Sequence, residues 1–374
     1  MNPTEDKVGA RLKDIDTPAL LLDVAAMERN LTRMAAFAAS RHVNLRPHAK
    51  IYKATPQLAR LQITAGAIGI TCAKLSEAEV LASAGIQEIL VANQIVGRLK
   101  MERLVNLARS CRVMVAVDSR ENIDEIDRSA QMQGLTIGAL IEVNIGHNRC
   151  GVAPFEPVAE LARYILGKPG LKFRGLMGYD GHNTLKVSEI ERGGYSLKAY
   201  RLLSDMRKYL EQAGTEVEIV SGGGTFTYRY AAEVEGITEL QTGTYLLMDT
   251  AFQEHGVHEF ECTLSVLASV ISRPEYAGAN GLVIVDTGRK SVSTALGLPE
   301  VKNPPRSGAS VISLSDEHGR VVFADPATAP RVGSKIELCV RDANGTINQF
   351  DRFYVIRDGA VEAVWKIPLL GCST

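Results

Sequence analysis

Eight apolar runs with strand character recur through the first two thirds of the chain and alternate with segments of helical period. This alternation is typical of βα units on a parallel sheet, and eight such units close into a barrel. The expected strands are residues 43–46, 67–71, 88–93, 112–118, 137–144, 172–179, 218–221 and 239–243. The sequence therefore predicts an α/β protein built on a (β/α)8 TIM-type barrel.

The segments between these runs have the apolar spacing of amphipathic helices. The expected helices are residues 24–39, 55–64, 76–84, 97–110, 120–132, 157–166 and 187–213. Asp23 is the expected N-cap of the first helix, and Ser76 with Glu79 forms a predicted capping box. The run TPALLLD at 17–23 precedes the first helix and is a ninth strand that the barrel does not need.

The helical pattern stops near Phe260, and short strand-like runs separated by glycine and proline follow. A chain of 374 residues suits a barrel of about 250 residues followed by a second unit of about 100. We expect a barrel domain over residues 24–259 and an all-β domain over 260–374.

Composition excludes several classes of protein. A formal net charge of −1 gives no broad field for nucleic acid or an anionic membrane. The first residues lack a signal-peptide pattern, and no run approaches the ~20 apolar residues of a membrane span. The 6 cysteines are scattered without metal-binding spacing, as expected for reduced thiols. We expect a cytoplasmic protein with a small-molecule substrate.

The expected strand ends carry unusually polar residues, and the active site of such a barrel lies at these ends. The first strand ends in RPHAK, residues 46–50. Desolvation there would disfavour the ammonium of Lys50 and make the amine a nucleophile suited to Schiff-base chemistry. His48 lies two residues earlier on the same side of an extended segment. A solvated lysine and a core histidine are the alternative interpretations.

Two small-residue stretches follow the seventh and eighth strands, where barrels of this type commonly hold a phosphate. The first is SGGGT at 221–225, whose glycines let backbone amides approach an anion, although a flexible turn would explain it equally well. The second is QTGTY at 241–245. Arg149, after the fifth strand, is a candidate cation for an aromatic cofactor, or else a surface ion-pair partner.

Together these motifs resemble the D-threonine aldolase and D-serine dehydratase group of fold-type III enzymes, which have the alanine-racemase-like fold and use pyridoxal 5'-phosphate. The resemblance runs in order from about residue 16 to residue 370. It is carried by RPHAK at 46–50, SEAE at 76–79, the stretch 144–152, GLMGYDGH at 175–182, SGGGT at 221–225, LQTGTYLLMD at 240–249, LSDEHG at 314–319 and RDGAVEAVW at 357–365.

The resemblance implies a role for each candidate residue. Lys50 would carry the cofactor as a Schiff base, with His48 and His182 as further catalytic candidates. The implied cofactor-binding residues are Lys50, Arg149, Tyr179, Ser221, Gly222, Gly223, Gly224, Thr225, Gln241, Gly243 and Tyr245. A homodimer is also implied, in which the β domain of one subunit covers the barrel mouth of the other. The resemblance further implies that the N-terminal strand, residues 16–23, joins that β domain.

The chain departs from the family at the metal site. Where the family has a histidine and a second strong ligand, the sequence reads Asp342-Ala343-Asn344. Such an oxygen pair does not favour zinc, and we expect at most weak binding of a hard cation such as Mg²⁺, Mn²⁺ or Ca²⁺ through oxygen ligands and water. His182 or His318 would be needed to restore a nitrogen ligand. Near the cofactor, Tyr52 and Ala73 also replace the family's usual histidine and glutamine.

The expected activity is retro-aldol cleavage of a β-hydroxy-D-amino acid. The alternatives are an amino-acid racemase or epimerase, and a dehydratase of D-β-hydroxy amino acids. A non-enzymatic carrier of pyridoxal phosphate is disfavoured, because such carriers resemble the barrel alone and this chain has a β domain of about 110 residues beyond it.

Overall fold

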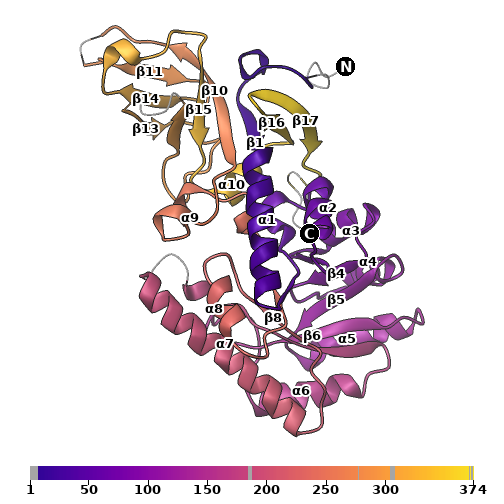
Figure 1. Ribbon diagram of the computed structural model, residues 1–374. Coiled ribbons are helices and arrows are strands. Elements are labelled where there is room, and N and C mark those ends of the chain that lie inside the picture. The colour runs from indigo at the N-terminus through magenta and orange to yellow at the C-terminus, as the bar shows by residue number, and fades with distance from the viewer. Residues whose placement is uncertain (1–6, 184–187, 277, 304–307, 370, 372–373) are drawn as a thin grey trace. The chain divides into compact units, whose positions relative to one another are not determined.

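The computed structural model describes residues 7–183, 188–276, 278–303, 308–369, 371 and 374 (Figure 1). The chain forms two compact units. The barrel unit consists of Thr32–Lys50, Ala54–Tyr245 and Cys372–Thr374. The β unit consists of Met1–Leu31, Ile51–Lys53 and Leu246–Gly371. None of the described helices combines the length and apolar composition that crossing a membrane requires.

The barrel unit contains a sheet of eight parallel strands in the order β2-β9-β8-β7-β6-β5-β4-β3. They are β2 (Asn44–Leu45), β3 (Ile70–Cys72), β4 (Glu88–Val91), β5 (Arg112–Val117), β6 (Ile137–Glu142), β7 (Leu171–Met177), β8 (Ile219–Gly222) and β9 (Glu239–Leu240). The two end strands also meet, because the Ile68 amide donates to the Leu45 carbonyl at 2.8 Å. The predicted eight-stranded barrel fold is thus confirmed.

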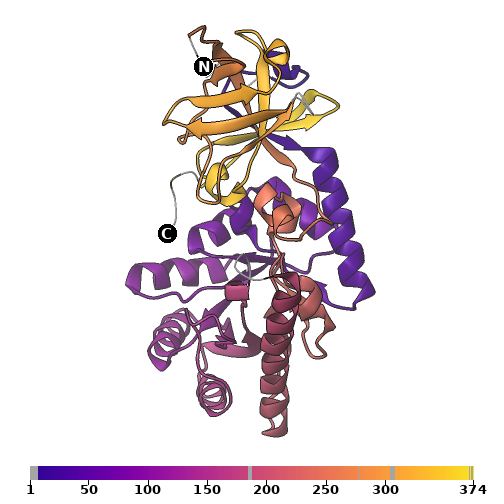
Figure 2. The ribbon, with the colours of Figure 1, turned by 90° about the vertical axis from the view of Figure 1, so that its left-hand side faces the viewer.

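Helices lie on the outer side of this sheet (Figure 2). They are α1 (Val24–Ser40), α2 (Pro56–Thr64), α3 (Leu75–Ser83), α4 (Arg98–Ala108), α5 (Arg120–Gln131), α6 (Glu156–Leu166), α7 (Glu189–Gln212) and α8 (Tyr228–Glu233). Asp23 caps α1 as predicted, since its Oδ1 accepts from the Ala26 amide at 3.0 Å. The predicted capping box of α3 is wrong: Glu77, not Glu79, accepts from the amides of Ala73 and Lys74.

Alternation along the strands decides which side chains face the barrel interior. One buried apolar cluster fills that interior and consists of Leu90, Met114, Ala116, Leu140, Met177 and Ile219. Residues two positions further along the same strands share this inner face. Glu142, Tyr179 and Ser221 follow Leu140, Met177 and Ile219 at this spacing, so they point inward at the C-terminal strand ends.

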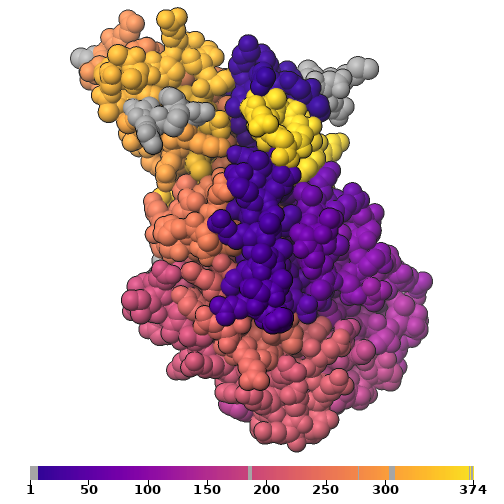
Figure 3. Space-filling model, viewed as in Figure 1, coloured from indigo at the N-terminus to yellow at the C-terminus, as the bar shows by residue number. Residues whose placement is uncertain are grey.

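The β unit is built on a second, largely antiparallel sheet. Its strands are β1 (Ala19–Asp23), β10 (Leu264–Ser272), β11 (Leu282–Val285), β12 (Glu300–Asn303), β13 (Ala309–Leu314), β14 (Gly319–Phe323), β15 (Lys335–Cys339), β16 (Arg352–Arg357) and β17 (Ala360–Lys366). Strand β1 pairs with β10 and β16. In Figure 3 these N-terminal residues (indigo) lie against the β16–β17 hairpin (yellow).

Short helical turns connect several of these elements. They are η1 (Leu12–Asp14), η2 (Ala49–Tyr52), η3 (Gly181–Asn183), η4 (Thr244–Leu246), η5 (Pro326–Thr328), α9 (Thr250–Glu254) and α10 (Ala343–Ile347). The helices α9 and α10 were not expected, because five residues are too few to show a 3.6-residue period. Turn η2 matters most for the site, since it carries Lys50 directly beyond the first barrel strand.

Candidate active site

Lys50 and His48 lie at the end of β2. The backbone amide of Lys50 donates to His48 Nδ1 at 3.3 Å, so the neutral imidazole carries its proton on Nε2. Burial, together with the charges of Lys50 and Arg149, holds the pKa of His48 well below its usual value. Burial and the Arg149 charge also lower the pKa of Lys50, although its side chain remains accessible. A neutral imidazole therefore lies beside a lysine biased toward the free amine.

Tyr179 brings two cations together at the end of β7. Lys50 Nζ lies 5.6 Å from the centroid of its ring, and the guanidinium carbon of Arg149 lies 5.7 Å from the same centroid. Burial and the neighbouring Asp180 carboxylate raise the pKa of the Tyr179 phenol. The ring is therefore a neutral aromatic surface that two cationic side chains share.

Glu142 forms an ion pair with Arg149, which also lies near Tyr179. The Arg149 guanidinium lies 3.8 Å from Glu142 Oε1, and Gln94 Nε2 donates to Glu142 Oε2 at 2.7 Å. Burial raises the pKa of Glu142, while the hydrogen bond from Gln94 and the charge of Arg149 oppose that shift. The buried carboxylate therefore lies next to a cation at the strand ends, and a guanidinium carries several donors that suit an anionic group.

Two histidines extend this cluster. The His147 ring meets Tyr179 edge-to-face at 5.6 Å and stacks on His182 at 5.8 Å with a 20° interplanar angle. Gly146 allows this approach, because a Cβ there would lie 3.0 Å from His182 Nε2. Partial burial lowers the pKa of His147, and the charges of Arg149 and His182 act in the same direction. These effects, which the Asp180 charge partly opposes, favour the neutral form of His147.

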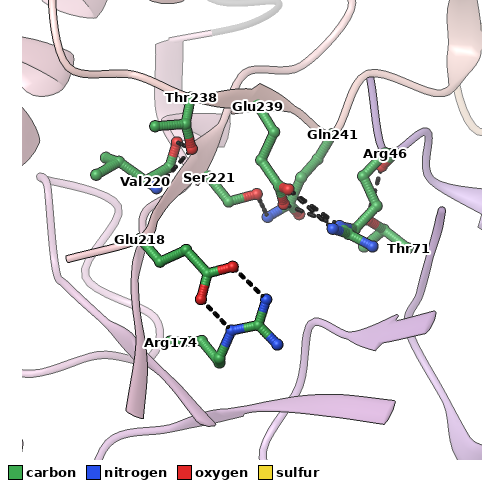
Figure 4. Close-up of polar contacts among 9 residues, drawn as sticks. All are labelled: Arg46, Thr71, Arg174, Glu218, Val220, Ser221, Thr238, Glu239 and Gln241. Atoms are coloured by element: carbon green, nitrogen blue, oxygen red, sulfur yellow. Dashed lines mark hydrogen bonds and ion pairs between the residues drawn. The ribbon is translucent and has the colours of Figure 1, made fainter. Parts of the chain in front are cut away.

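Ser221 and Gln241 meet inside the barrel on adjacent strands (Figure 4). Gln241 Nε2 donates to Ser221 Oγ at 2.8 Å, and Ser221 is fully buried. One layer below, the Arg46 guanidinium forms a buried ion pair with Glu239 at 3.0 Å. Glu239 and Gln241 lie two residues apart along the chain, so their side chains share the inner face.

The glycine run after β8 forms a tight turn. Gly223 adopts a φ of +81°, which favours glycine. Its amide donates to Tyr200 at 2.7 Å, and the Gly224 amide donates to Thr227 Oγ1 at 3.2 Å. These two amides are therefore already engaged inside the protein. A Cβ on Gly224 would lie 3.3 Å from Tyr179 Cε2, so the turn packs directly against that ring.

The loop after β9 joins this turn from the other side. Thr225 Oγ1 accepts from the Tyr245 amide at 3.0 Å and lies 2.9 Å from Thr242 Oγ1. Gly243 passes close to the lysine-bearing segment, since a Cβ there would lie 2.4 Å from the His48 carbonyl oxygen. The two expected phosphate loops are thus neighbours of each other, and the second also adjoins His48.

Asp342 and Asn344 lie in the β unit, at the start of α10. Asp342 is the N-cap: its Oδ1 accepts from the Gly345 amide at 3.0 Å and its Oδ2 accepts from Ser293 Oγ at 2.6 Å. Asn344 and His318 are exposed. Within the residues that the structure describes, no three histidine, cysteine or carboxylate side chains are grouped to hold a metal ion.

The structure thus gathers His48, Lys50, Arg149 and Tyr179, and it places His182 one ring away. The sequence offered no reason to assign a role to His147, whose ring contacts both His182 and Tyr179. It also gave no role to Glu142 and Gln94. The available signal was position: Glu142 lies on an inward-facing site at a strand end, and His147 precedes Arg149 by two residues.

A family model for the N-terminal domain of alanine racemase matches residues 22–251. A second model, for a serine dehydratase domain, matches residues 263–356. The first match alone spans more than half of the chain. The chain belongs to the alanine racemase N-terminal domain family, and this membership implies pyridoxal 5'-phosphate as the cofactor.

Individual proteins of this family are similar to the chain over nearly its whole length. D-threonine aldolase from Arthrobacter sp is 36% identical over 99% of this chain and 97% of the relative. The crystal structure of D-threonine aldolase from Filomicrobium marinum has a TM-score of 0.93 and 37% identity, covering 98% of this chain and 99% of that one. D-threo-3-hydroxyaspartate dehydratase from Delftia sp. HT23 has a TM-score of 0.86 and 27% identity, covering 95% and 98%.

Proposed function

We propose that this protein is a pyridoxal-phosphate-dependent lyase that cleaves a β-hydroxy-D-amino acid between Cα and Cβ. The observation that carries the proposal is the arrangement of Lys50 and Arg149 over the ring of Tyr179. The full-length similarity to two D-threonine aldolases supports it.

The barrel residues fit this cofactor. Lys50 is an accessible amine of lowered pKa, as a covalent link to an aldehyde requires. Arg149 and Tyr179 offer a cation and an aromatic face beside it. The remaining residues proposed to hold the cofactor are Ser221, Gly222, Gly223, Gly224, Thr225, Gln241, Gly243 and Tyr245. Once bound, pyridoxal phosphate withdraws electrons from the bond that breaks at Cα.

Cleavage requires a base that takes the proton of the substrate's β-hydroxyl group. His48 does not suit this role in its present tautomer, because its Nδ1 already accepts from the Lys50 amide and its Nε2 carries the proton. We assign proton removal to His182 and its orientation to the stacked His147 ring. His48 would instead donate from Nε2 toward the bound molecule.

The proposal also includes the domain bounds, the metal, the cellular location and the oligomeric state expected from the sequence. The two family models match on either side of residue 260, which supports functional domains at 24–259 and 260–374. A metal, if used, would be Mg²⁺ or Mn²⁺ at Asp342 and Asn344. We also propose a cytoplasmic location and a homodimer.

Dehydration of the same class of substrate is the second candidate, since the Delftia relative is a dehydratase of a β-hydroxy-D-amino acid. Both reactions need the cofactor on a lysine and differ in which bond breaks. Product analysis separates them: glycine and an aldehyde indicate cleavage, whereas a 2-oxoacid and ammonia indicate dehydration. Appearance of the opposite enantiomer would instead support a racemase or epimerase.

Lys50 should be the residue that carries the cofactor. Purified protein with pyridoxal phosphate should absorb visible light, and borohydride reduction should fix the label on the peptide that contains Lys50. The variant Lys50→Ala should lose the band, whereas Lys53→Ala should keep it. Peptide mass spectrometry checks the position, and a label on Lys53 or Lys74 would contradict the assignment.

His182→Asn should separate proton removal from cofactor binding. Removing a general base lowers the rate by about 10²- to 10⁴-fold. We therefore expect kcat to fall in this range while the visible band and the affinity for pyridoxal phosphate stay unchanged. An unchanged kcat with D-threonine or another cleaved substrate would exclude His182 as the base.

A further inference from the structure

Asp180 carries a fully buried carboxylate directly after Tyr179. Three hydroxyl groups donate to it: Ser196 Oγ at 2.6 Å, the Tyr200 hydroxyl at 2.7 Å and Thr227 Oγ1 at 2.9 Å. Burying a carboxylate is costly unless hydrogen bonds compensate it. Strand alternation turns Asp180 away from the barrel interior that Tyr179 faces, so the carboxylate lies behind the site.

The two carboxylate oxygens of Asp180 serve different elements. Oδ2 accepts from Ser196, which lies on α7. Oδ1 accepts from both Tyr200 and Thr227. Each of these two hydroxyls also accepts a hydrogen bond from the glycine turn. The Gly223 amide donates to the Tyr200 hydroxyl, and the Gly224 amide donates to Thr227 Oγ1. Oδ1 is therefore linked through two hydroxyls to two successive amides of one loop.

The shape of the turn depends on the same contacts. The Tyr200 ring packs on Gly222, where a Cβ would lie 2.7 Å from Tyr200 Cε1. A side chain at position 222 would thus push Tyr200 away from Asp180. The hydroxyl of Tyr200 both donates and accepts, and such chains of hydrogen bonds strengthen one another in a dry interior. Burial and the Asp180 charge raise the pKa of Tyr200 well above its usual value, so the hydroxyl keeps its proton.

We propose that Asp180 is the positioning residue of the loop that receives the cofactor phosphate. It acts through Tyr200 and Thr227, which anchor the amides of Gly223 and Gly224 and so fix where the rest of the loop lies. This inference rests on the proposed function, because it takes residues 221–225 as the phosphate loop. Asp180 contributes to phosphate affinity without touching the phosphate.

The test compares two ligands that differ only in the phosphate, pyridoxal 5'-phosphate and pyridoxal. The full-length protein is stripped of cofactor, and the dissociation constant of each ligand is measured by its visible band. Tyr200→Phe and Thr227→Val remove one linking hydroxyl each and nearly preserve shape. Ser196→Ala is the matched control, because it removes a donor to the carboxylate oxygen that is not linked to the loop.

Tyr200→Phe and Thr227→Val should each weaken pyridoxal phosphate binding about tenfold, which is about 1.4 kcal/mol and within the range of one lost hydrogen bond. Their affinity for pyridoxal should change less than about twofold, and Ser196→Ala should change both affinities by less than about twofold. This phosphate-specific loss would not arise from a general loss of folding. Thermal unfolding checks that each variant is folded.

Three results would overturn the inference. Equal losses for both ligands would show that Tyr200 and Thr227 act on the fold or on ring binding. A loss in Ser196→Ala matching that in Tyr200→Phe would show that the buried carboxylate as a whole matters, not its link to the loop. Unchanged affinities in both hydroxyl variants would show that the loop needs no anchor. Wild-type protein without a Lys50-dependent band would instead overturn the proposed function, and this inference with it.

Discussion

Lys50 and Arg149 both lie near the ring of Tyr179, and their positive charges repel each other. Burial and the Arg149 charge lower the pKa of Lys50, whereas Glu77 acts weakly in the other direction. An amine attacks an aldehyde only when it is neutral, so a lowered pKa keeps Lys50 reactive at lower pH. Arg149 therefore influences how readily the lysine captures the cofactor, in addition to any contact with it.

Arg149→Met should move the reactivity of Lys50 to higher pH. Removing the neighbouring cation stabilises the ammonium, so a larger share of Lys50 is protonated at any given pH. The test measures, as a function of pH, the rate at which Lys50 reacts with pyridoxal, with the product trapped by borohydride. The midpoint of this pH profile should be higher for Arg149→Met than for wild type. The control Arg98→Met removes an exposed arginine of α4 and should leave the midpoint unchanged. A midpoint that stays or falls in Arg149→Met would contradict this electrostatic coupling.

Asp342 is used as a helix cap, and this has consequences for metal dependence. Both of its carboxylate oxygens accept hydrogen bonds, from the Gly345 amide and from Ser293. One engaged carboxylate and the exposed Asn344 lack the imidazole and thiolate that give zinc its affinity. Dialysis against EDTA should leave activity unchanged, or Mg²⁺, Mn²⁺ or Ca²⁺ should restore it. Stoichiometric zinc that survives dialysis and disappears in Asp342→Ala would show this expectation to be wrong.

At the scale of elements, the ion pair between Arg46 and Glu239 joins the first and last strands of the barrel. Both side chains are almost completely buried, and Arg46 Nε and Nη2 donate to the Glu239 carboxylate. Gly69 on the neighbouring segment makes room for the guanidinium, because a Cβ there would lie 2.3 Å from Arg46 Nη1. Barrel closure therefore places a charge pair where solvent cannot compensate either partner.

Glu239→Gln should destabilise the barrel strongly. It leaves the Arg46 charge buried without its counter-ion, which costs about 3–5 kcal/mol. Glu102→Gln is the control, since it breaks an exposed Arg98–Glu102 pair on α4 that is worth about 0.5 kcal/mol or less. Urea unfolding followed by circular dichroism measures both differences. Similar small losses in the two variants would show that the buried pair is not needed for closure.

The order of elements could be predicted because each barrel strand is a short apolar run between turn residues. Strand ends were less predictable: β9 ends at Leu240, although the apolar pattern suggested Gly243. The N-cap of α3 was predicted at Ser76, with Glu79 as its partner, but the helix is capped at Lys74, two residues earlier, with Glu77 as the acceptor. The sequence pattern of a capping box fits Ser76 and Glu79 and therefore did not reveal this shift. Local patterns thus locate elements but not their last turn.

Some residues of the candidate site could likewise be predicted from the sequence, and others could not. Lys50 and Tyr179 could be placed because barrel strand ends converge on one face. The engagement of the Gly223 and Gly224 amides could not be foreseen, because one partner, Tyr200, comes from the middle of α7 and follows no strand-end rule. His147 was missed because its role depends on a ring contact with His182, more than thirty residues away in the sequence.

At the scale of the whole molecule, Lys50 is accessible to solvent, so a cofactor bound to it would need protection from water. Water competes for a covalent lysine–aldehyde link and weakens electrostatic contacts in an open site. A second subunit whose β domain covers the barrel mouth would exclude it. The family resemblance implies this arrangement, and the exposed side chain of Arg149 at the mouth is consistent with a surface that a partner covers.

The active protein should therefore be a homodimer with twice the 40.5 kDa mass of the chain. Light scattering coupled to size exclusion at micromolar concentration measures this mass, and activity is assayed on the same fraction. Dilution below the dimer dissociation constant should lower specific activity and bleach the visible band together, because both depend on the covered mouth. A monomer that keeps full activity and a stable band would show that one barrel protects its cofactor alone, and the partner's β domain would then have no part in catalysis.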